Sequence, residues 1–447
     1  MIIDEIDAHS WYHKNNSSRG EDMDQDKYQE YIDILKEELV CAMGCTEPIA
    51  VAYAAALARK VLGRIPERVR VKASSNIIKN VKSVVVPNTG GARGISAAAA
   101  AGIIAGDADQ ELRVLAFISP EEITQMKDFL EHTEILVTPS DKEYIFHIEV
   151  SLEAEGHHSK VEIAGFHTNV IHVEVDGKTL QAHDYEEQSN HYKTDRSLLS
   201  IEDIITFADQ VDLALLEELL QRQIDCNMAI AREALGGDYG ANIGKILLES
   251  YGDDVFNKAK AYAAAGSDGR MNGCELPVVI NSGSGNQGLT ASLPVVIYAE
   301  ELGSSQEELY RALVVSNLVT IHLKTGIGRL SAYCGATSAG CGAAAGISYL
   351  HGGRYNDVAH TIVNAVAINS GMICDGAKAS CAAKIASAVE AGLLGYQMQR
   401  SGQQFYDGDG IVVKGVENTI RNVGALASIG MRETDKTIIE LMTRGSC

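Results

Sequence analysis

Apolar residues follow two different periodicities along the chain. Residues 28–41 carry apolar side chains at helical spacing, and an Ala-rich stretch runs on to Leu62, so two helices are predicted there. From residue 68 onward, short alternating or apolar runs stand between turn residues, a pattern typical of strands. The predicted strands are residues 69–74, 82–87, 112–118, 134–137, 145–154, 159–163 and 170–175, and further helices are predicted at 95–106 and 120–131.

Beyond residue 198 the pattern is almost entirely helical and rich in small residues. Runs such as GCGAAAG and ASCAAKIASAVEAG put Gly and Ala where helix backbones must approach closely. We therefore predict an α+β protein: mainly a helical domain built on a small-residue-rich bundle, with an inserted α+β sheet domain. The predicted parts are a polar N-terminal extension at 1–25, N-terminal helices packing on the helical domain at 26–62, the α+β domain at 63–197 and the helical domain at 198–447.

The composition is that of an ordinary soluble globular protein. Of 447 residues, 46% are hydrophobic and 22% are charged. The net charge of -22 argues against nucleic acid or an anionic membrane as a partner, because both attract basic patches. The first residues lack the apolar core of a secretory signal, so we expect a cytoplasmic protein. Nine cysteines in such a chain indicate metal ligands, reactive thiols or core residues rather than disulfides.

Four of the nine cysteines fall in one stretch, from Cys334 to Cys381. Apolar residues at helical spacing predict a helix that stops near Gly371 and returns the chain toward Cys334. The helix formers in 377–392 place Cys374 at a predicted helix N-terminus and Cys381 about two turns into that helix, where the helix dipole favours anionic thiolates. These three cysteines could meet as a metal site, but their spacing matches no standard short motif and leaves open that they are buried small residues.

The segment GRLSAYCGATSAGCGAAAG, followed by GMICDGAKASC, resembles the iron–sulfur motif of the serine dehydratase alpha-chain family. This resemblance maps the cluster ligands to Cys334, Cys374 and Cys381 and leaves Cys341 as a packing residue. Three thiolates leave one iron of a 4Fe-4S cluster without a protein ligand, and an open iron can bind substrate and act as a Lewis acid. A fourth cysteine would close the site and favour electron transfer or a structural role.

Charged and thiol groups near this motif bear on the same site. Three thiolates carry net negative charge, so nearby cations would offset it and could also bind a substrate carboxylate, although solvated surface positions are the alternative. Cys447 is expected to be a disordered tail thiol, or else a further ligand that reaches the open iron. The cations are Lys324, Arg329, Lys378 and Lys384.

The chain also contains the segments GCTEPIAVA at 44–52, PNTGGARG at 87–94 and FHTNVIHVEVDG at 166–177. These segments resemble the L-cysteine desulfidase family more closely still, and the similarity covers roughly residues 30–447. In that family the cysteine of the first shared motif is assigned as the proton acceptor, which implies Cys45 here. A thiol needs a pKa lowered toward neutrality for that role, and a buried helix-end cysteine is the alternative. The short spacing between Cys374 and Cys381 departs from bacterial serine dehydratases and argues against serine as the main substrate.

A glycine-rich stretch, NSGSGNQG at residues 281–288, follows an apolar run. Its backbone amides could hold a substrate carboxylate, as the resemblance implies, or a cofactor phosphate, and a tight strand-to-helix turn is the plain alternative. The residues expected to bind substrate are Thr46, Glu47, Ser282, Gly283, Ser284, Gly285 and Asn286.

The resemblance as a whole implies a cytoplasmic lyase with a 4Fe-4S cluster, an L-cysteine desulfidase that converts L-cysteine to sulfide, pyruvate and ammonia. We expect a small amino-acid substrate, no nucleic acid, no membrane, and a homodimer. Three alternatives stay open. They are an iron–sulfur L-serine dehydratase, a pyridoxal-phosphate lyase whose Schiff-base lysine no motif marks, and a non-enzymatic protein whose cysteines bind structural zinc or only pack.

Overall fold

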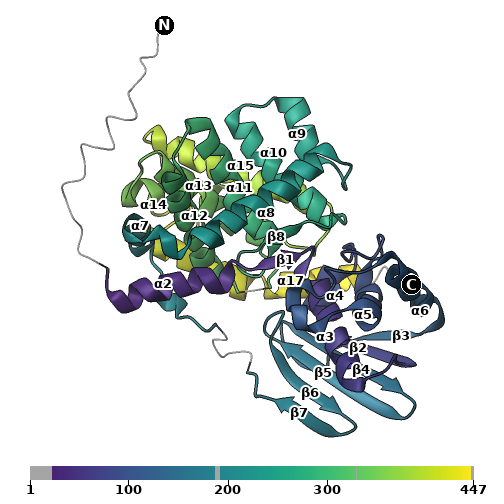
Figure 1. The fold of residues 1–447 in the computed structure, drawn as a ribbon. Coiled ribbons are helices and arrows are strands. Elements are labelled where there is room, and N and C mark those ends of the chain that lie inside the picture. The colour runs from purple at the N-terminus through teal and green to yellow at the C-terminus, as the bar shows by residue number, and fades with distance from the viewer. Residues whose placement is uncertain (1–22, 187–191, 329, 444–447) are drawn as a thin grey trace.

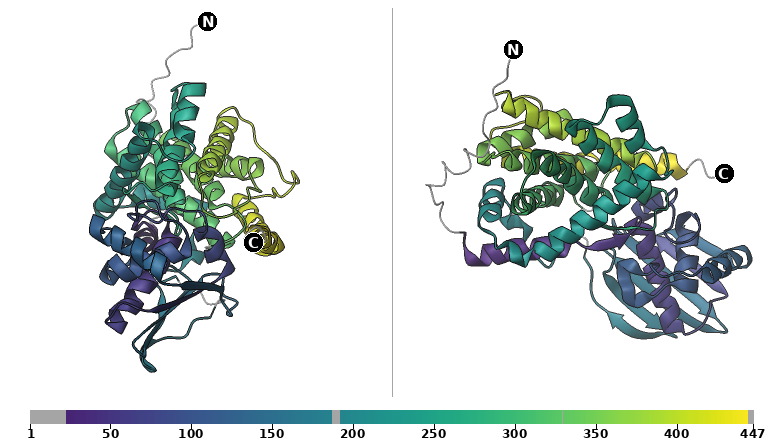
Figure 2. Two further views of the ribbon diagram at one scale, coloured as in Figure 1. Left: turned by 90° about the vertical axis from the view of Figure 1, so that its right-hand side faces the viewer. Right: turned by 45° about the horizontal axis from the view of Figure 1, so that its top comes forward.

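The computed structural model describes residues 23–186, 192–328 and 330–443, and its fold is α+β (Figure 1). A large helical part and a smaller part built on a sheet lie side by side in both further views (Figure 2). Within the described ranges, no helix is both long and apolar enough to cross a membrane. The predictions for Arg329, Cys447 and most of the N-terminal extension fall outside the described residues.

A mixed sheet forms the smaller part. Its strands are β2 (Arg68–Ala73), β3 (Ile135–Pro139), β4 (His147–Ala154), β5 (His157–Ala164), β6 (Val170–Val175) and β7 (Lys178–Ala182). They lie in the order β3-β2-β4-β5-β6-β7. Strands β2 and β3 are parallel, whereas the other neighbouring pairs are antiparallel. Ile148, Val150 and Leu152 of β4 are all buried, as the alternation in the sequence predicts.

Ala-rich helices cover one face of this sheet. Helix α3 (Thr46–Leu62) packs on β4, β5 and α5 (Gly94–Ala105). A Cβ atom at Gly102 would lie 2.1 Å from the carbonyl oxygen of Ala52, so only glycine allows α5 to approach α3 this closely. Further elements of this part are α4 (Ser75–Val81), the 3-10 helix η1 (Ala108–Arg113) and α6 (Pro120–His132).

The start of the chain joins the two parts. Helix α2 (Gln25–Glu38) packs on the helical part, where Tyr31 contacts an aromatic ring of α7 (Ile201–Gln210). Strand β1 (Cys41–Met43) pairs antiparallel with β8 (Pro277–Val279). The chain then turns into α3 on the sheet, so the two N-terminal helices pack on different parts of the molecule. The predicted domain boundaries themselves stay a prediction.

The larger part is a bundle whose inner helices touch through glycine. A Cβ atom at Gly340 would lie 2.3 Å from the carbonyl oxygen of Ala388, and one at Gly392 would lie 2.4 Å from that of Gly340. The helices after α7 are α8 (Glu217–Gly236), α9 (Ile243–Tyr251), α10 (Val255–Met271), α11 (Gly285–Leu302), α12 (Gln306–Ile327), α13 (Gly335–Leu350), α14 (Tyr355–Ile368), α15 (Cys381–Arg400), α16 (Val416–Ala425) and α17 (Arg432–Thr443). The short 3-10 helix η2 (Arg196–Leu198) precedes α7, the 3-10 helix η3 (Leu213–Leu215) follows it, and the π-helix η4 (Leu426–Gly430) follows α16.

The predicted strand at 82–87 is wrong. These residues follow α4 and enter a glycine-rich turn that is closed by an isolated bridge between Val85 and Arg93. Val84 is fully buried. The apolar run therefore reflects a buried loop rather than a strand, a distinction that periodicity alone cannot make.

The predicted strand at 112–118 is also wrong. It covers the end of η1 and the turns after it, where Leu115 is fully buried. Strand β7 was not predicted, because all of its residues are exposed and the sequence therefore shows no apolar alternation.

Candidate active site

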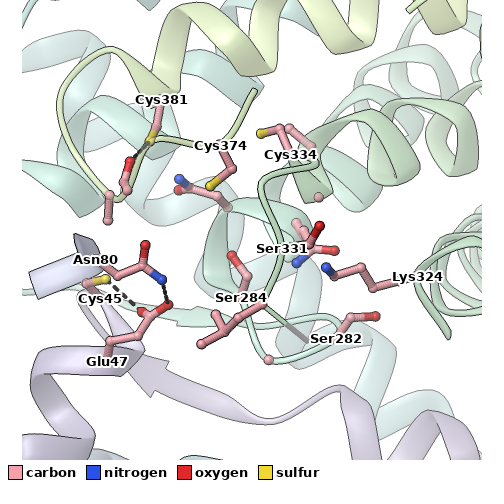
Figure 3. Close-up of a pocket in the computed structure, with 18 of the residues that line it drawn as sticks. Cys45, Glu47, Asn80, Ser282, Ser284, Lys324, Ser331, Cys334, Cys374 and Cys381 are labelled. Carbon is pink, nitrogen blue, oxygen red and sulfur yellow. Dashed lines mark hydrogen bonds between the residues drawn. The ribbon is translucent and has the colours of Figure 1, made fainter. Parts of the chain in front are cut away.

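A cavity of about 110 Å³ lies where the helical part meets the sheet part (Figure 3). Its wall contains Cys45, Glu47, the three predicted cysteine ligands, and four of the five predicted residues of the glycine-rich loop. Thr46 and Gly285 do not line the cavity but contact residues that do. Residues from distant parts of the chain therefore meet around one space, which we call the site cavity.

Backbone pairing holds Cys334 and Cys374 side by side. The Cys334 N–H donates to the carbonyl oxygen of Met372 at 2.9 Å, and the Cys374 N–H donates to that of Ala332 at 2.6 Å. A hydrogen bond from the Cys334 thiol lowers the pKa of Cys374 to about 6. The same hydrogen bond, together with burial, raises the pKa of Cys334 well above its ordinary value.

Cys381 is the first residue of α15, and Cys374 lies in the loop before that helix. The prediction that Cys374 begins a helix and that Cys381 lies inside it is therefore wrong. The cause is Gly376, whose φ of 93° is left-handed and keeps the loop out of a helical path. A Cβ atom at Gly376 would lie 2.5 Å from the carbonyl oxygen of Lys79, so the loop is pressed onto α4.

We call Cys334, Cys374 and Cys381 the cysteine wall. Several lysines lie near it. Asp375 lies 2.5 Å from Lys378 and also pairs with Lys384. Lys79 is buried and pairs with Asp435 of α17 at 2.5 Å. The charges of Lys79 and Lys384 help to keep the pKa of Cys374 below its ordinary value. These lysines therefore favour a thiolate at Cys374, whereas burial raises the pKa of Cys381 above its ordinary value.

Cys45 lies at the N-terminus of α3 on the other side of the site cavity (Figure 3). Its thiol donates a hydrogen bond to Oε2 of Glu47 at 3.0 Å. Burial raises the pKa of Cys45 well above its ordinary value, and the Glu47 carboxylate raises it further. This shift is opposite to the one expected of a base, because the helix N-terminus is outweighed by burial and by a negative neighbour.

Glu47 is ionised and held by donors. Besides the Cys45 thiol, the side-chain amide of Asn80 donates to Oε1 at 3.0 Å. Burial raises the pKa of this carboxyl group, but the charge of His167 and the hydrogen bond from Cys45 outweigh burial and leave the pKa below its ordinary value. Glu47 is therefore a carboxylate in direct contact with a thiol proton.

The glycine-rich loop is a turn that leads into α11. Asn281 fixes its start by donating from Nδ2 to Oδ1 of Asn317 at 3.0 Å. Ser282 and Gly283 both have left-handed φ angles, of 51° and 77°. Ser284 occupies the N-cap position of α11, but its side chain caps no backbone amide of the helix. The first amides of α11 thus have no side-chain partner in this cap.

The cavity wall also contains Asn80, Arg270 and Gln287, which the sequence did not single out. Asn80 lies on α4, which the sequence pattern did not reveal. Arg270 lies near the end of α10, and a charged residue in that small-residue helix is the signal that could have found it. Gln287 directly follows the last predicted loop residue. Of the predicted lysines, Lys324 lines the cavity.

The chemistry of the cysteine wall bears on a bound metal. Among the described residues, no three His, Cys, Asp or Glu side chains are grouped tightly enough to hold a single metal ion. Three thiols from separate segments, flanked by lysines, have the donor chemistry of an iron–sulfur cluster, in which different thiolates bind different irons. Cys341 is buried within α13 and is not part of the cavity wall.

Comparisons with known proteins give a family. The family model described as serine dehydratase alpha chain matches residues 109–440, a range that contains the cysteine wall and the glycine-rich loop but not Cys45. A UPF0597 protein of Desulfitobacterium hafniense is 59% identical over 419 residues, which are 94% of this chain and 97% of that protein. UPF0597 proteins of Lachnoclostridium phytofermentans and Finegoldia magna are 49% and 47% identical, over 93% and 92% of this chain and 99% of each relative.

Proposed function

The chain belongs to the serine dehydratase alpha chain family, and from this premise we propose that it is an iron–sulfur L-cysteine desulfidase. The family supports a lyase-type enzyme. Our proposal adds L-cysteine as the substrate and an iron–sulfur cluster as the cofactor. One observation carries it: a wall of three cysteines and a thiol–carboxylate pair line the same small cavity. A metal-assisted elimination needs both an electrophile and a base next to one substrate.

Cys334, Cys374 and Cys381 would hold a 4Fe-4S cluster. Bound there, such a cluster would supply a Lewis acid for the leaving sulfur, because sulfur is a preferred ligand of iron. The lysines of the cysteine wall support this role, since they offset the negative charge of three thiolates.

Cys45 and Glu47 would act together as the base. The Cys45 thiol passes its proton to the Glu47 carboxylate with which it is hydrogen-bonded, and the thiolate so formed accepts the α-proton of the substrate. The electron pair of the broken Cα–H bond forms a Cα=Cβ double bond and expels the β-sulfur as sulfide. The remaining aminoacrylate tautomerises and hydrolyses to pyruvate and ammonia.

The glycine-rich loop would orient the substrate. The amides of Gly285 and Asn286 at the start of α11, and those of Ser282 and Gly283 in the turn before it, support a site for the α-carboxylate, because the Ser284 side chain does not cap the helix. Thr46 lies 3.1 Å from both the Gly283 carbonyl oxygen and Oε2 of Glu47, and so links the loop to the base.

A second candidate is an iron–sulfur L-serine dehydratase, which the family description favours. The same residues would then eliminate hydroxide instead of sulfide. Sulfide is the better leaving group and the softer ligand, which is why cysteine is our first choice.

Turnover of L-cysteine and L-serine by protein handled without oxygen tests the proposal. We expect equal amounts of sulfide and pyruvate from L-cysteine, and a kcat/KM for L-serine that is lower by about tenfold or more. A preference for L-serine would establish the second candidate, and purified protein with zinc or without iron would favour a non-enzymatic role. The expected homodimer stays a prediction, which the mass of the protein in solution would check.

A further inference from the structure

Arg270 is a buried cation that has no hydrogen-bond or ion-pair partner among the described residues. It lies near the end of α10, it is 2% exposed, and it lines the site cavity. Within the described part of the chain its guanidinium group makes no hydrogen bond and no ion pair, and its Nε atom is buried. Because a buried unpaired charge is costly, such a group in a cavity wall indicates a site for an anion.

Glu47 does not neutralise this charge directly. The charge of Arg270 acts on the pKa of both Glu47 and Cys45. The carboxylate oxygens of Glu47, however, already accept hydrogen bonds from the Cys45 thiol and the Asn80 amide, and no ion pair joins Glu47 to Arg270. The guanidinium group is therefore free to bind an anion that enters the site cavity.

The glycine-rich loop is shaped around Arg270. A Cβ atom at Gly285 would lie 2.3 Å from Nε of Arg270 and 2.7 Å from Val278, so any other residue would displace the guanidinium group. The first amides of α11 begin at this same glycine, and Ser284 leaves them without a side-chain cap. A planar guanidinium group beside helix N-terminal amides is well suited to a carboxylate.

Acceptor groups lie next to this anion site. The side-chain oxygens of Asn286 and Gln287 are buried and have no hydrogen-bond partner among the residues that the structure describes. The Gln287 amide packs against Gly335, where a Cβ atom would lie 2.6 Å from its Cδ, so it is held beside Cys334. Buried oxygens without donors are costly, and an ammonium group would satisfy them.

We propose that Arg270 binds the α-carboxylate of the substrate and that Asn286 and Gln287 accept hydrogen bonds from its α-ammonium group. The site between α10 and α11 thus recognises the zwitterion of a free amino acid, and the side chain of that amino acid points to the cysteine wall. Arg270 adds a charged anchor to the loop amides, and Gln287 adds a neutral acceptor. This inference rests on the proposed function only in taking an amino acid as the substrate.

Ligand binding without turnover tests the inference. L-Alanine has no leaving group, ethylamine is L-alanine without the carboxylate, and propionate is L-alanine without the ammonium group. Titration calorimetry of the full chain without oxygen should show that wild type binds L-alanine at least about tenfold more tightly than either fragment. Binding of L-alanine no tighter than ethylamine would overturn the inference.

Variants show which side chains bind the carboxylate and the ammonium group. Arg270→Gln should bind L-alanine and ethylamine equally, whereas Gln287→Leu should reduce the preference for L-alanine over propionate. Gly285→Ala keeps the arginine but displaces it, and should weaken L-alanine binding as well. Arg232→Gln, at an arginine whose side chain is 64% exposed, is the matched control and should bind as wild type does.

The outcomes separate this inference from the proposed function. If Arg270→Gln, Arg270→Lys and Gly285→Ala all bind L-alanine as tightly as wild type, the inference is wrong even where sulfide release from L-cysteine is normal. If L-alanine binding depends on Arg270 in a protein that releases no sulfide, the amino-acid site stands and only the proposed reaction is wrong. Rescue by Arg270→Lys, measured as a KM for L-cysteine nearer to wild type than that of Arg270→Gln, supports a charge-based role.

Discussion

Cysteines occupy two sides of the site cavity in opposite electrostatic surroundings. On the cysteine wall, a thiol hydrogen bond and lysine charges lower the pKa of Cys374 to about 6. Across the cavity, burial and the Glu47 carboxylate raise the pKa of Cys45 well above its ordinary value. Cys374 is therefore favoured as an anionic ligand, whereas Cys45 is a protonated thiol beside a carboxylate. On the side of Cys374, its hydrogen bond with Cys334 raises the pKa of Cys334, and burial raises that of Cys381.

The two sides of the cavity are therefore suited to different chemical roles, metal binding on one side and proton transfer on the other. Thiolates that bind iron must be anionic at rest, and nearby lysines favour that state. A base that stays protonated until substrate arrives does not compete for the metal, but it needs a second group to take its proton. Glu47 can fill that need because it is an ionised carboxylate and already accepts a hydrogen bond from the Cys45 thiol.

The largest effect is expected on the cysteine wall. Cys374→Ala removes one of three thiolates, so we expect loss of the bound iron and a fall in turnover of about a thousandfold or more. Iron analysis and sulfide release, both measured without oxygen, check this. Cys341→Ala is the control, because that buried cysteine does not line the cavity and should keep its iron. Equal iron content in the two variants would contradict the ligand assignment.

Across the cavity, Cys45→Ala should separate chemistry from cofactor binding. We expect normal iron content and a fall in kcat of about 10²–10⁴, the usual contribution of a general base. Cys41→Ala is the matched control, since Cys41 lies outside the cavity wall and is only partly buried. A Cys45→Ala protein with wild-type kcat would show that the base is another residue.

Glu47→Gln should change the pH profile more than the maximal rate. In wild type the Cys45–Glu47 pair holds one proton at every pH between the lowered pKa of Glu47 and the raised pKa of Cys45. The rate should therefore not change with pH near neutrality. The variant has only the thiol, whose pKa stays raised by burial. Its rate should therefore rise about tenfold per pH unit between about pH 6 and 9, from a value about 10²-fold lower at neutral pH. Flat profiles for both proteins would argue against proton transfer to Glu47.

The smallest effect is expected at Gly376, where the loop that carries Cys374 packs against α4. Gly376→Ala places a methyl group against the Lys79 backbone at a left-handed φ, so it should lower the free energy of unfolding by about 1–3 kcal/mol and reduce iron content in part. Thermal unfolding and iron analysis check both effects. Gly371→Ala, where no atom lies within 4 Å of the added Cβ, should be nearly neutral.

Regular patterns made much of the fold predictable. Strand β6 has the predicted bounds, and α6 ends one residue later than predicted, because each is a short apolar or periodic run between turn residues. The run at 82–87 could not be assigned correctly, since a buried loop and a buried strand show the same apolar residues. Strand β7 carries no signal because its position is set by pairing with β6 rather than by burial.

The candidate site, like the fold, could be predicted from the sequence only in part. The cysteine motif and the glycine-rich loop are each local in sequence, so the order of amino acids is enough to select them as candidates. The direction of the Cys45 pKa shift could not be predicted in this way, because burial at the junction of two parts of the fold decides it. Arg270 could not be assigned either, since its role depends on the packing of α10 against the start of α11.

Mössbauer spectra of protein enriched in ⁵⁷Fe and kept without oxygen test the central claim most directly. We expect about four irons per chain, and addition of L-cysteine should change the signal of about one of them while the other three keep their thiolate and sulfide ligands. Cys374→Ala should lack this spectrum. A protein without iron, or spectra in which L-cysteine changes none of the iron sites, would contradict the proposal that three cysteines leave one iron open to substrate.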